Sequence, residues 1–352
     1  MDISPSIWQG KRVLVTGHTG FKGSWLVLLL NELGAEVVGL SLPPPEIGYS
    51  LFKDAQIQSL VTYEYFIDIR DEEKVNSAIQ SSGIDYAFHL AAQAFVNRSL
   101  KNPLESITTN ILGTANVLLS LFKLDSLQGI TVVTSDKVYQ NLEKGTPFSE
   151  MDRLGSKDPY SASKAAVELI TNSLSSTCNP FNIPVTTARA GNVLGGGDWG
   201  EDRLVPDLVK AMISNQTLLI RNPNASRPWQ HVLDCLRGYL LLGQSHLNKN
   251  KGTPISINFG PSESLSVIEL IHIFELSFKK KINYEIVKSN NYESTWLELD
   301  SKLAKDYLDW QTLLSPEDAI NQTADWYLKF TNGADSKQLM QQEIINYRLG
   351  KW

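Results

Sequence analysis

The stretch "VLVTGHTGFKGSWL", residues 13–26, joins a short β-branched run to an apolar run through three glycines. Gly17, Gly20 and Gly23 stand where a strand would turn into a helix. The first glycine permits a tight turn, the second lets the backbone approach a pyrophosphate, and a helix N-terminus offers free N–H groups and a partial positive charge. The stretch therefore predicts a dinucleotide-binding loop, although its first glycine gap is one residue longer than the common fingerprint.

The residues after this loop complete a strand–helix–strand unit, with a helix-like pattern over 23–33 and a second strand over 36–41. A loop at the first strand–helix junction of such a unit is more than an ordinary turn. The acid that would hold the ribose hydroxyls is missing, because Leu40, Ser41 and Leu42 stand at the end of the second strand. The loop alone therefore leaves both NAD and NADP open.

Strand and helix patterns continue to alternate as far as residue 190. Further strands are predicted over 61–66, 86–90, 130–135 and 185–188, and helices after Asp71, over 103–122 and over 160–177. This regular alternation predicts an α/β fold with a doubly wound parallel (Rossmann) sheet and helices on both faces.

The rhythm changes beyond residue 191 to loops rich in Gly, Pro and Asn, mixed with helices such as 204–214. We expect a dinucleotide-binding Rossmann domain over 1–190 and a smaller C-terminal α/β domain, which binds the substrate, over 191–352. A strand pattern at 255–260 fits either domain, so the first domain is expected to include a later strand near 231–260.

The composition of the 352 residues, 42% hydrophobic and 20% charged, is that of a globular protein. A net charge of −6 without a basic block argues against nucleic-acid binding. Two cysteines and five histidines without ligand spacing predict neither a disulfide framework nor a metal site. The first ten residues lack the basic and apolar regions of a signal peptide, and no long apolar segment follows. We expect a cytoplasmic protein that does not enter a membrane.

A cluster of polar residues ends the strand predicted over 130–135. Ser135, Asp136 and Lys137 deliver a hydroxyl, an acid and an amine in succession. Such groups are costly to bury. The cluster therefore needs hydrogen-bond or ionic partners, a place in a solvent-facing loop, or a role in a reaction.

A second candidate group lies in "DPYSASKAAVELI", residues 158–170. Tyr160 and Lys164 are four residues apart just after a proline that starts a helix, so both side chains share one helix face. A lysine beside a phenol stabilises the phenolate, and we expect it to lower the pKa of Tyr160. Together with the glycine loop and Ser135, this pair indicates hydride transfer.

These motifs stand in the order of the extended short-chain dehydrogenase/reductase family, which the chain resembles over nearly its whole length, including "HLAAQ" at 89–93. The resemblance implies that Tyr160 takes the proton of a substrate hydroxyl, that Ser135 hydrogen-bonds the same oxygen and that Lys164 also holds the nicotinamide ribose of NAD. The residues expected to bind the cofactor are Gly17, Gly20, Phe21, Lys22, Gly23, Asp68, Ile69, Leu90, Ala91, Ala92, Tyr160 and Lys164.

Within that family the chain is similar to nucleotide-sugar 4,6-dehydratases, and "TSDKVY" (134–139), "ARAGNVLGGGDW" (188–199) and "RPWQHV" (227–232) resemble the group acting on CDP-glucose. The resemblance implies oxidation at C4, elimination of water across C5 and C6, and return of the hydride to C6. Relatives carry Asp-Glu after the serine or threonine, whereas this chain carries Asp136 and Lys137. Asp136, if burial keeps it protonated, is expected to donate its proton to the C6 oxygen, which then leaves as water.

The role of Lys137 has two readings. A lysine that takes the C5 proton must be neutral, which desolvation and nearby cations such as Lys164 would favour. Alternatively, Lys137 only positions Asp136 or the sugar. The residues expected to contact the substrate are Gln93, Asn192, Arg203, Arg221 and Arg227.

The resemblance also implies a homodimer or homotetramer. Two rival functions stay open at this point. A nucleotide-sugar 4-epimerase would need Ser135, Tyr160 and Lys164 but has no use for the acid and amine that follow the serine. A non-catalytic dinucleotide-sensing protein on the same fold would be expected to have lost a catalytic group.

Overall fold

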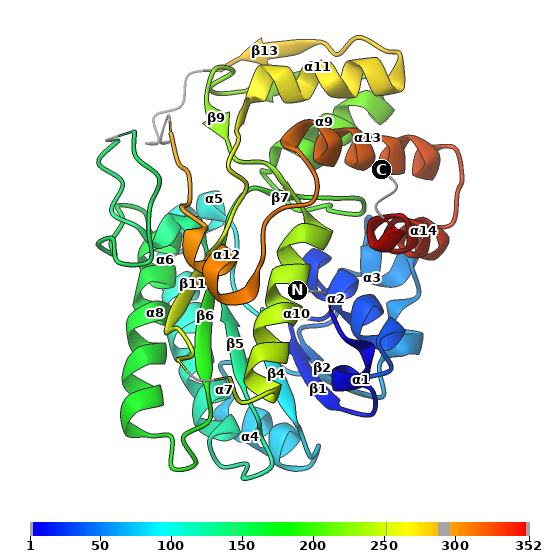
Figure 1. Ribbon diagram of the computed structural model, residues 1–352. Helices are drawn as coiled ribbons and strands as arrows, with labels where there is room; N and C mark the ends of the chain where they lie inside the picture. The colour runs from blue at the N-terminus through cyan, green and yellow to red at the C-terminus, as the bar shows by residue number, and fades with distance from the viewer. Residues whose placement is uncertain (1–2, 144, 251, 288–295, 350–352) are drawn as a thin grey trace.

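The computed structural model describes residues 3–143, 145–250, 252–287 and 296–349 (Figure 1). Its main sheet has seven parallel strands in the order β11-β6-β5-β4-β1-β2-β3. The strands are β1 (Arg12–Thr16), β2 (Glu36–Ser41), β3 (Tyr63–Phe66), β4 (Tyr86–His89), β5 (Ile130–Val133), β6 (Val185–Ala190) and β11 (Ser256–Phe259). The predicted doubly wound parallel sheet is confirmed. The chain changes direction between β1 and β4, and ligands of such sheets bind where the carboxyl ends of the strands open at this reversal.

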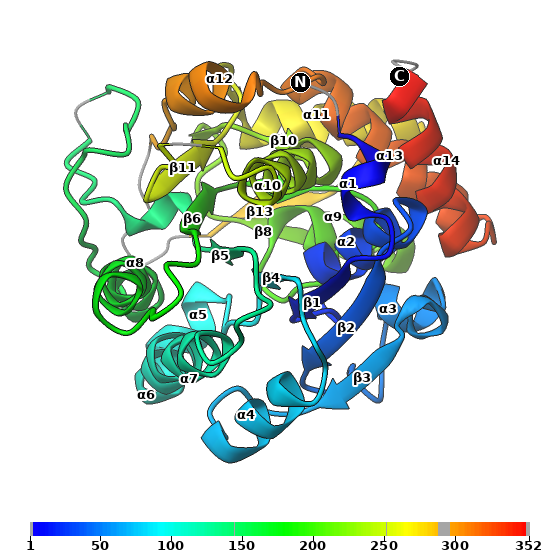
Figure 2. The same ribbon diagram turned by 60° about the horizontal axis from the view of Figure 1, so that its bottom comes forward.

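Helices cover both faces of the main sheet because its strands are apolar on both sides. Val13 and Val15 of β1 enter one buried cluster, whereas Leu14 between them enters another. One face is covered by α2 (Phe21–Glu32) and α10 (Val232–Leu247), and the other by α4 (Glu72–Gln80), α7 (Gly113–Leu121) and α8 (Pro159–Thr177) (Figure 2).

The helix predicted over 103–122 is not one regular helix. It consists of α6 (Pro103–Ile107), a π-helical turn (Thr108–Leu112) and α7. Gly113 follows the turn, and a Cβ on it would lie 2.5 Å from the side chain of Ile69. The prediction missed the turn because none of its residues breaks a helix, and a residue pattern does not report i→i+5 hydrogen bonding.

Other predicted boundaries differ by one or two residues. Helix α2 begins at Phe21, β3 begins at Tyr63, β4 ends at His89 and β5 ends at Val133. The remaining short elements of this half are α1 (Pro5–Trp8), α3 (Leu51–Asp54), the 3₁₀ turn Ile57–Leu60 and α5 (Val96–Lys101).

Most elements after β6 form a smaller layer above the carboxyl ends of the main strands (Figure 1). Its helices are α9 (Leu204–Ser214), α11 (Val267–Phe278), α12 (Lys302–Leu308), α13 (Pro316–Thr331) and α14 (Ser336–Leu349). Its short strands pair as β7 (Val193–Leu194) with β10 (Gln230–His231), β9 (Ser226–Arg227) with β12 (Leu265–Ser266), and β8 (Leu218–Ile220) with β13 (Tyr284–Ile286). Helix α10 and strand β11 return to the main sheet, and the division at residue 190 stays a prediction.

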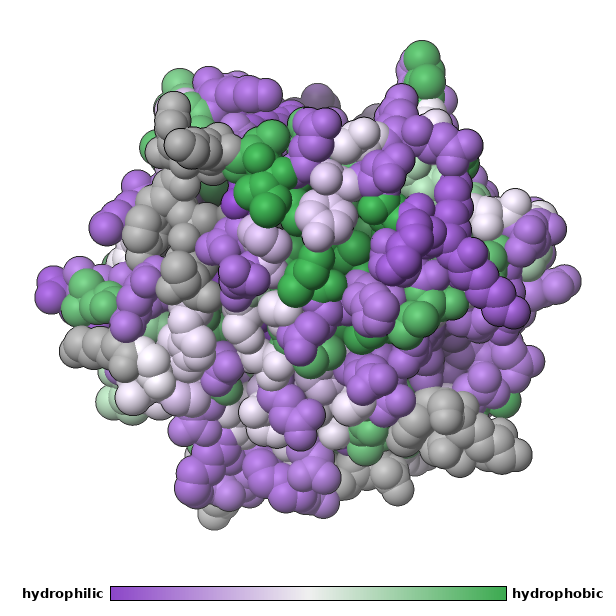
Figure 3. Space-filling model, turned by 90° about the horizontal axis from the view of Figure 1, so that it is seen from above, coloured by the Kyte–Doolittle hydropathy of each residue, from purple (hydrophilic) through white to green (hydrophobic). Residues whose placement is uncertain are grey.

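The surface of this layer is mainly hydrophilic, with a band of hydrophobic residues across it (Figure 3). Leu219 of β8, Leu276 of α11 and Ile286 of β13 are exposed. Cys178 is exposed and Cys235 is buried, and both thiols are free. Among the described residues, no helix has the length and apolar character to cross a membrane, and no cluster of His, Cys, Asp and Glu could hold a metal ion.

Candidate active site

The glycine loop after β1 is shaped by backbone contacts. Gly17 has φ +75°, and its N–H donates to the carbonyl of Leu40 at 2.8 Å. A Cβ on Gly17 would lie 2.9 Å from the backbone nitrogen of Ala91, and one on Gly23 would lie 2.1 Å from the carbonyl oxygen of Gly17. Both positions therefore require glycine, the first for its left-handed backbone and both for the close approach of other backbone atoms.

The N-terminus of α2 opens toward the cavity that the loop borders. Gly20 is the N-cap, no side chain caps the helix, and Gly20, Phe21 and Lys22 line the cavity. Unbonded N–H groups and the helix dipole favour an anion here. The loop and the helix start thus fit the pyrophosphate of a dinucleotide.

The end of β2 offers hydroxyls instead of a carboxylate. Ser41 donates to the carbonyl of Leu42 at 2.8 Å, and its hydroxyl lies 2.9 Å from that of Thr19. Sequence reasoning did not select Thr19, which lies inside the glycine loop. The two hydroxyls line the cavity where a ribose is expected.

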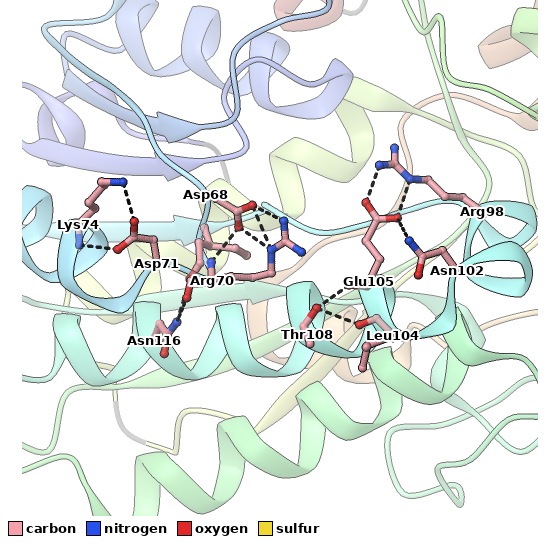
Figure 4. A network of polar contacts seen from close by, with 11 residues as sticks. Asp68, Arg70, Asp71, Lys74, Arg98, Asn102, Leu104, Glu105, Thr108 and Asn116 are labelled. Carbon is pink, nitrogen blue, oxygen red and sulfur yellow. Dashed lines mark hydrogen bonds and ion pairs between the residues drawn. The ribbon is translucent and has the colours of Figure 1, made fainter.

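Asp68 lies in the same cavity but already has a partner (Figure 4). The guanidinium of Arg70 donates to both carboxylate oxygens of Asp68, and this hydrogen bonding lowers the pKa of Asp68. Nearby, Arg98 pairs with Glu105, and both line the cavity. Arg70, Arg98 and Glu105 were missed by sequence reasoning, because surface ion pairs of this kind carry no motif.

The polar cluster after β5 is folded into one 3₁₀ turn, Asp136–Val138. The Ser135 hydroxyl accepts from the N–H of Lys137 at 3.2 Å and donates to Asp136 Oδ1 at 2.9 Å. Asp136 is buried as expected, whereas the side chain of Lys137 is exposed. The expectation that Lys137 is desolvated is therefore wrong for this structure, because its side chain is exposed although it lines the cavity.

Asp136 is held against the loop that follows β6. Its Oδ2 accepts a long hydrogen bond, 3.4 Å, from the side-chain amide of Asn192. A Cβ on Gly191 would lie 1.9 Å from the same oxygen. Gly191 was not singled out from the sequence, since its requirement comes from a side chain 55 positions earlier in the chain. The acid can occupy this place only because residue 191 has no side chain.

Tyr160 and Lys164 lie in the first two turns of α8, which Asp158 caps by accepting from the N–H of Ser161. Tyr160 is buried, and the Ser135 side chain is close enough to act on its phenol, so the two groups expected to share one substrate oxygen lie together. The Lys164 ammonium donates to the carbonyl of Val133 at 3.1 Å.

The predicted fall in the pKa of Tyr160 is wrong for this structure. Burial raises the pKa of Tyr160 to about 12, and the hydrogen bond with Ser135 offsets only part of the shift. Burial, followed by repulsion from Lys22, lowers the pKa of Lys164 to about 7. The prediction took a fully charged lysine for granted, but an ammonium taken out of water loses much of its preference for the charged form.

A buried network stands behind these residues. Arg189 of β6 pairs with Glu168 of α8 at 2.9 Å, and both are buried. Glu168 also accepts from the hydroxyl of Thr134, and Arg189 donates to the Tyr139 hydroxyl at 2.7 Å. Because these polar groups satisfy one another, the network fixes the strand end that carries Ser135.

Two predicted substrate contacts have partners inside the protein. The Gln93 amide donates to the carbonyl of Phe95 and to the Ser106 hydroxyl, so it shapes its own loop. Arg203 donates to Asp198 at 2.9 Å, and its guanidinium lies 5.4 Å from the centre of the Phe95 ring.

The other three predicted contacts differ in exposure. Arg221 is exposed, Arg227 is buried, and Asn192 is partly buried, two residues after the end of β6, with φ +50°. All three border the same cavity, of about 1430 Å³.

Every predicted site residue lines this one cavity. They are Gly17, Gly20, Phe21, Lys22, Gly23, Asp68, Ile69, Leu90, Ala91, Ala92, Gln93, Ser135, Asp136, Lys137, Tyr160, Lys164, Asn192, Arg203, Arg221 and Arg227. The cavity runs from the glycine loop to the smaller layer, which is room for a dinucleotide and a second ligand. Lining a cavity does not by itself assign a role, so the individual roles stay predictions.

Residues 13–259, from β1 to the end of β11, match the model of the NAD dependent epimerase/dehydratase family. The chain belongs to this family. It is therefore an enzyme, and its cofactor is NAD. The glycine loop and the open start of α2 fit that cofactor in their geometry.

Among the family's curated members, the chain is 36% identical to the CDP-glucose 4,6-dehydratase of Salmonella typhimurium, over 98% of both chains. It is 26% identical to a dTDP-glucose 4,6-dehydratase of Haemophilus influenzae, over 90% of this chain and 97% of the relative. Both relatives are nucleotide-sugar 4,6-dehydratases, the group that the sequence motifs of this chain resemble.

Solved structures of the family share the fold. A UDP-glucuronic acid 4-epimerase from Bacillus cereus, in complex with UDP-glucuronic acid and NAD, matches with a TM-score of 0.77 and 25% identity, over 91% of this chain and 99% of that one. A dTDP-glucose 4,6-dehydratase from Streptomyces venezuelae matches with a TM-score of 0.78 and 24% identity, over 91% and 98%. Epimerases and dehydratases thus have the same architecture, and only the site can separate them.

Proposed function

We propose that this family member is an NAD-dependent 4,6-dehydratase that converts CDP-glucose to CDP-4-dehydro-6-deoxyglucose and water. The observation that carries the proposal is the acid–amine pair, Asp136 and Lys137, directly beside Ser135 in the cavity. The likeness to the Salmonella enzyme over nearly the whole chain supports the choice of CDP-glucose.

The first half of the reaction uses Ser135, which follows the carboxyl end of β5, and Tyr160, at the start of α8. Tyr160 accepts the proton of the sugar 4-hydroxyl while Ser135, whose side chain acts on the same phenol, binds the same oxygen. Arg203 acts electrostatically to lower the pKa of Tyr160 and so favours the phenolate. NAD, held by the glycine loop and Lys164, would supply the acceptor for the C4 hydride and the donor of the same hydride to C6. The ketone formed at C4 makes the C5 proton acidic.

The second half uses the acid and the amine. Asp136 donates a proton to the C6 oxygen, which leaves as water, and its buried position against Gly191 and Asn192 holds the carboxyl in place. Lys137 takes the C5 proton directly or through water. The other reading, that Lys137 only positions Asp136 or the sugar, predicts normal C5 exchange in a Lys137→Ala variant.

The nucleoside diphosphate binds the smaller layer. Asn192 and Arg227 are the main diphosphate contacts, and Arg203 and Arg221 are secondary ones. Gln93 belongs to the sugar end of the cavity, where its loop lies.

The enzyme forms a homodimer or homotetramer. Exposed apolar side chains follow one another along the helices on the α4–α7–α8 face, namely Leu104, Ile107, Leu112, Leu119 and Leu169. Burial of such a row in a symmetric interface would remove it from water. The enzyme works in the cytoplasm, in the synthesis of deoxysugars for surface polysaccharide such as the O-antigen of lipopolysaccharide.

The same residues argue against the two rival functions, a nucleotide-sugar 4-epimerase and a non-catalytic sensor. An epimerase has no step that uses Asp136 and Lys137, and a non-catalytic sensor has no reason to keep Ser135, Tyr160 and Lys164 together. A single incubation of the purified protein with CDP-glucose and NAD in deuterated water, followed by NMR, tests all three. We expect a 4-keto-6-deoxy sugar with deuterium at C5. An epimerised sugar, or unchanged CDP-glucose, would refute the proposal.

A further inference from the structure

The loop after β2, residues 42–50, leaves the main sheet beside the start of α2. The hydroxyl of Thr19, in the glycine loop, donates to the carbonyl of Leu42 at 3.0 Å. Three consecutive prolines restrict the backbone that follows. The carbonyl of Pro45 accepts from the Lys53 ammonium at 2.6 Å, so the loop is folded back onto α3.

The loop after β7, residues 195–203, also begins beside the start of α2. A Cβ on Gly195 would lie 3.2 Å from the ring of Phe21, the first residue of that helix. Further along, the ring of Trp199 packs edge to face with that of Tyr327 on α13, with centroids 5.3 Å apart. This loop therefore connects the glycine loop to the smaller layer.

The two loops are joined by two contacts. The ring of Tyr49 stacks on that of Trp199, with centroids 4.2 Å apart and an angle of 20° between the planes. Next to this stack, Leu51 packs against Gly197, and a Cβ on that glycine would lie 2.4 Å from Leu51 Cδ1. We call these two contacts the strap. The strap thus links the segment that follows β2 to the segment that follows β7.

The strap closes a ring of chain around the dinucleotide end of the cavity. All four residues of the strap line this cavity, as do Thr19 and Phe21, where the two loops begin. Stacked rings with centroids 4.2 Å apart are in van der Waals contact, so nothing passes between them. A dinucleotide that lies on the glycine loop would therefore be enclosed by the two loops.

We propose that the strap is a gate for the cofactor, which opens when NAD enters or leaves and is closed while NAD is bound. Because the side chain of Tyr49 is 46% exposed, the stack can separate without opening the core. A gate changes the rates of binding and release together and leaves the dissociation constant nearly the same. A residue that holds NAD directly acts mainly on release and so changes the dissociation constant.

The test follows NADH fluorescence by stopped flow, with the whole chain and without sugar. Binding is measured after the protein is mixed with NADH, and release after the NADH complex is mixed with excess NAD. We expect Tyr49→Ala to speed both steps on the order of ten-fold, which is the size of effect that loss of one aromatic stack produces. The dissociation constant should change less than about three-fold, because both rates rise together.

Two further variants show whether the stacked ring is responsible. Tyr49→Phe keeps the ring and should exchange NADH at the wild-type rates. Ile47→Ala is the matched control, since Ile47 lies in the same loop, is 91% exposed and does not line the cavity. In a Trp199→Leu background, Tyr49→Ala should give no further acceleration, because the ring on which it stacks is absent.

Wild-type rates in Tyr49→Ala would overturn the proposal. Faster release with unchanged binding would overturn it as well, because Tyr49 would then hold NAD directly. Equal acceleration by Ile47→Ala would assign the effect to the loop as a whole and refute the role of the stack. The measurement needs no nucleotide sugar, so its outcome does not depend on whether the enzyme is a dehydratase.

Discussion

The glycine loop after β1 and the polar turn after β5 lie at the same edge of one sheet but are built in different ways. The loop is made by backbone: Gly17 and Gly23 are confined by the main chain of Ala91 and by each other. The turn is made by side chains: Asp136 is placed by Ser135, Asn192 and the bare backbone of Gly191. A backbone site tolerates no added atom, whereas a side-chain site can be altered one chemical group at a time.

The largest effect is expected at the backbone site. Gly17→Ala puts a Cβ 2.9 Å from the nitrogen of Ala91 at φ +75°, so the loop must move away from the start of α2. We expect NAD affinity to fall on the order of 100-fold, about 3 kcal/mol, in a titration with the purified protein.

Gly10→Ala is the matched control for this change. Gly10 also has a positive φ, +70°, but nothing lies within 4 Å of its added Cβ. It should lose about 1 kcal/mol of stability and keep full NAD affinity. If Gly17→Ala also kept full affinity, the loop would not hold the pyrophosphate.

A smaller and more selective effect is expected at the side-chain site. Gly191→Ala inserts a Cβ where Asp136 Oδ2 now lies, so the acid must turn away from the sugar. We expect turnover of CDP-glucose to fall on the order of ten-fold, while binding of NAD is unchanged. In an Asp136→Asn background the same substitution should add little, and a full additive loss would show that Gly191 acts elsewhere.

The smallest effect concerns stability. Burial holds the pKa of Lys164 at about 7, below its ordinary value of 10.5, so the unfolded chain binds this proton more tightly than the folded one. Stability therefore rises with pH from about 7 upward, and it is lost as pH falls toward 7. The melting temperature of NAD-free Lys164→Met should rise a few degrees less than that of the wild type over this range. Parallel pH profiles would contradict the buried-amine account.

The same contrast explains how much the sequence could predict. The glycine loop was predicted because its requirement is local: three glycines between a strand and a helix. The order of strands and helices was predicted for the same reason, since periodicity over a few residues decides each element. The π-helical turn at Thr108–Leu112 was missed because its pattern is that of an α-helix.

The chemistry of the side-chain site could be predicted only in part. The sequence selected residues that the fold brings together, since Ser135, Asp136, Tyr160 and Lys164 all line the cavity, but their roles stay predictions. Their environments were not, because burial depends on the whole fold. The direction of the Tyr160 pKa shift, the exposure of Lys137 and the need for Gly191 arise from contacts between residues far apart in the chain.

The central claim is that oxidation and elimination use separate groups, with Asp136 serving only the second. It is tested most directly by mixing Asp136→Asn with NAD and CDP-glucose and following NADH absorbance and the sugar product together. The account predicts that NADH and a 4-keto sugar that has kept its C6 oxygen accumulate while water loss slows on the order of 100-fold. Water loss at the wild-type rate, or no NADH at all, would contradict it.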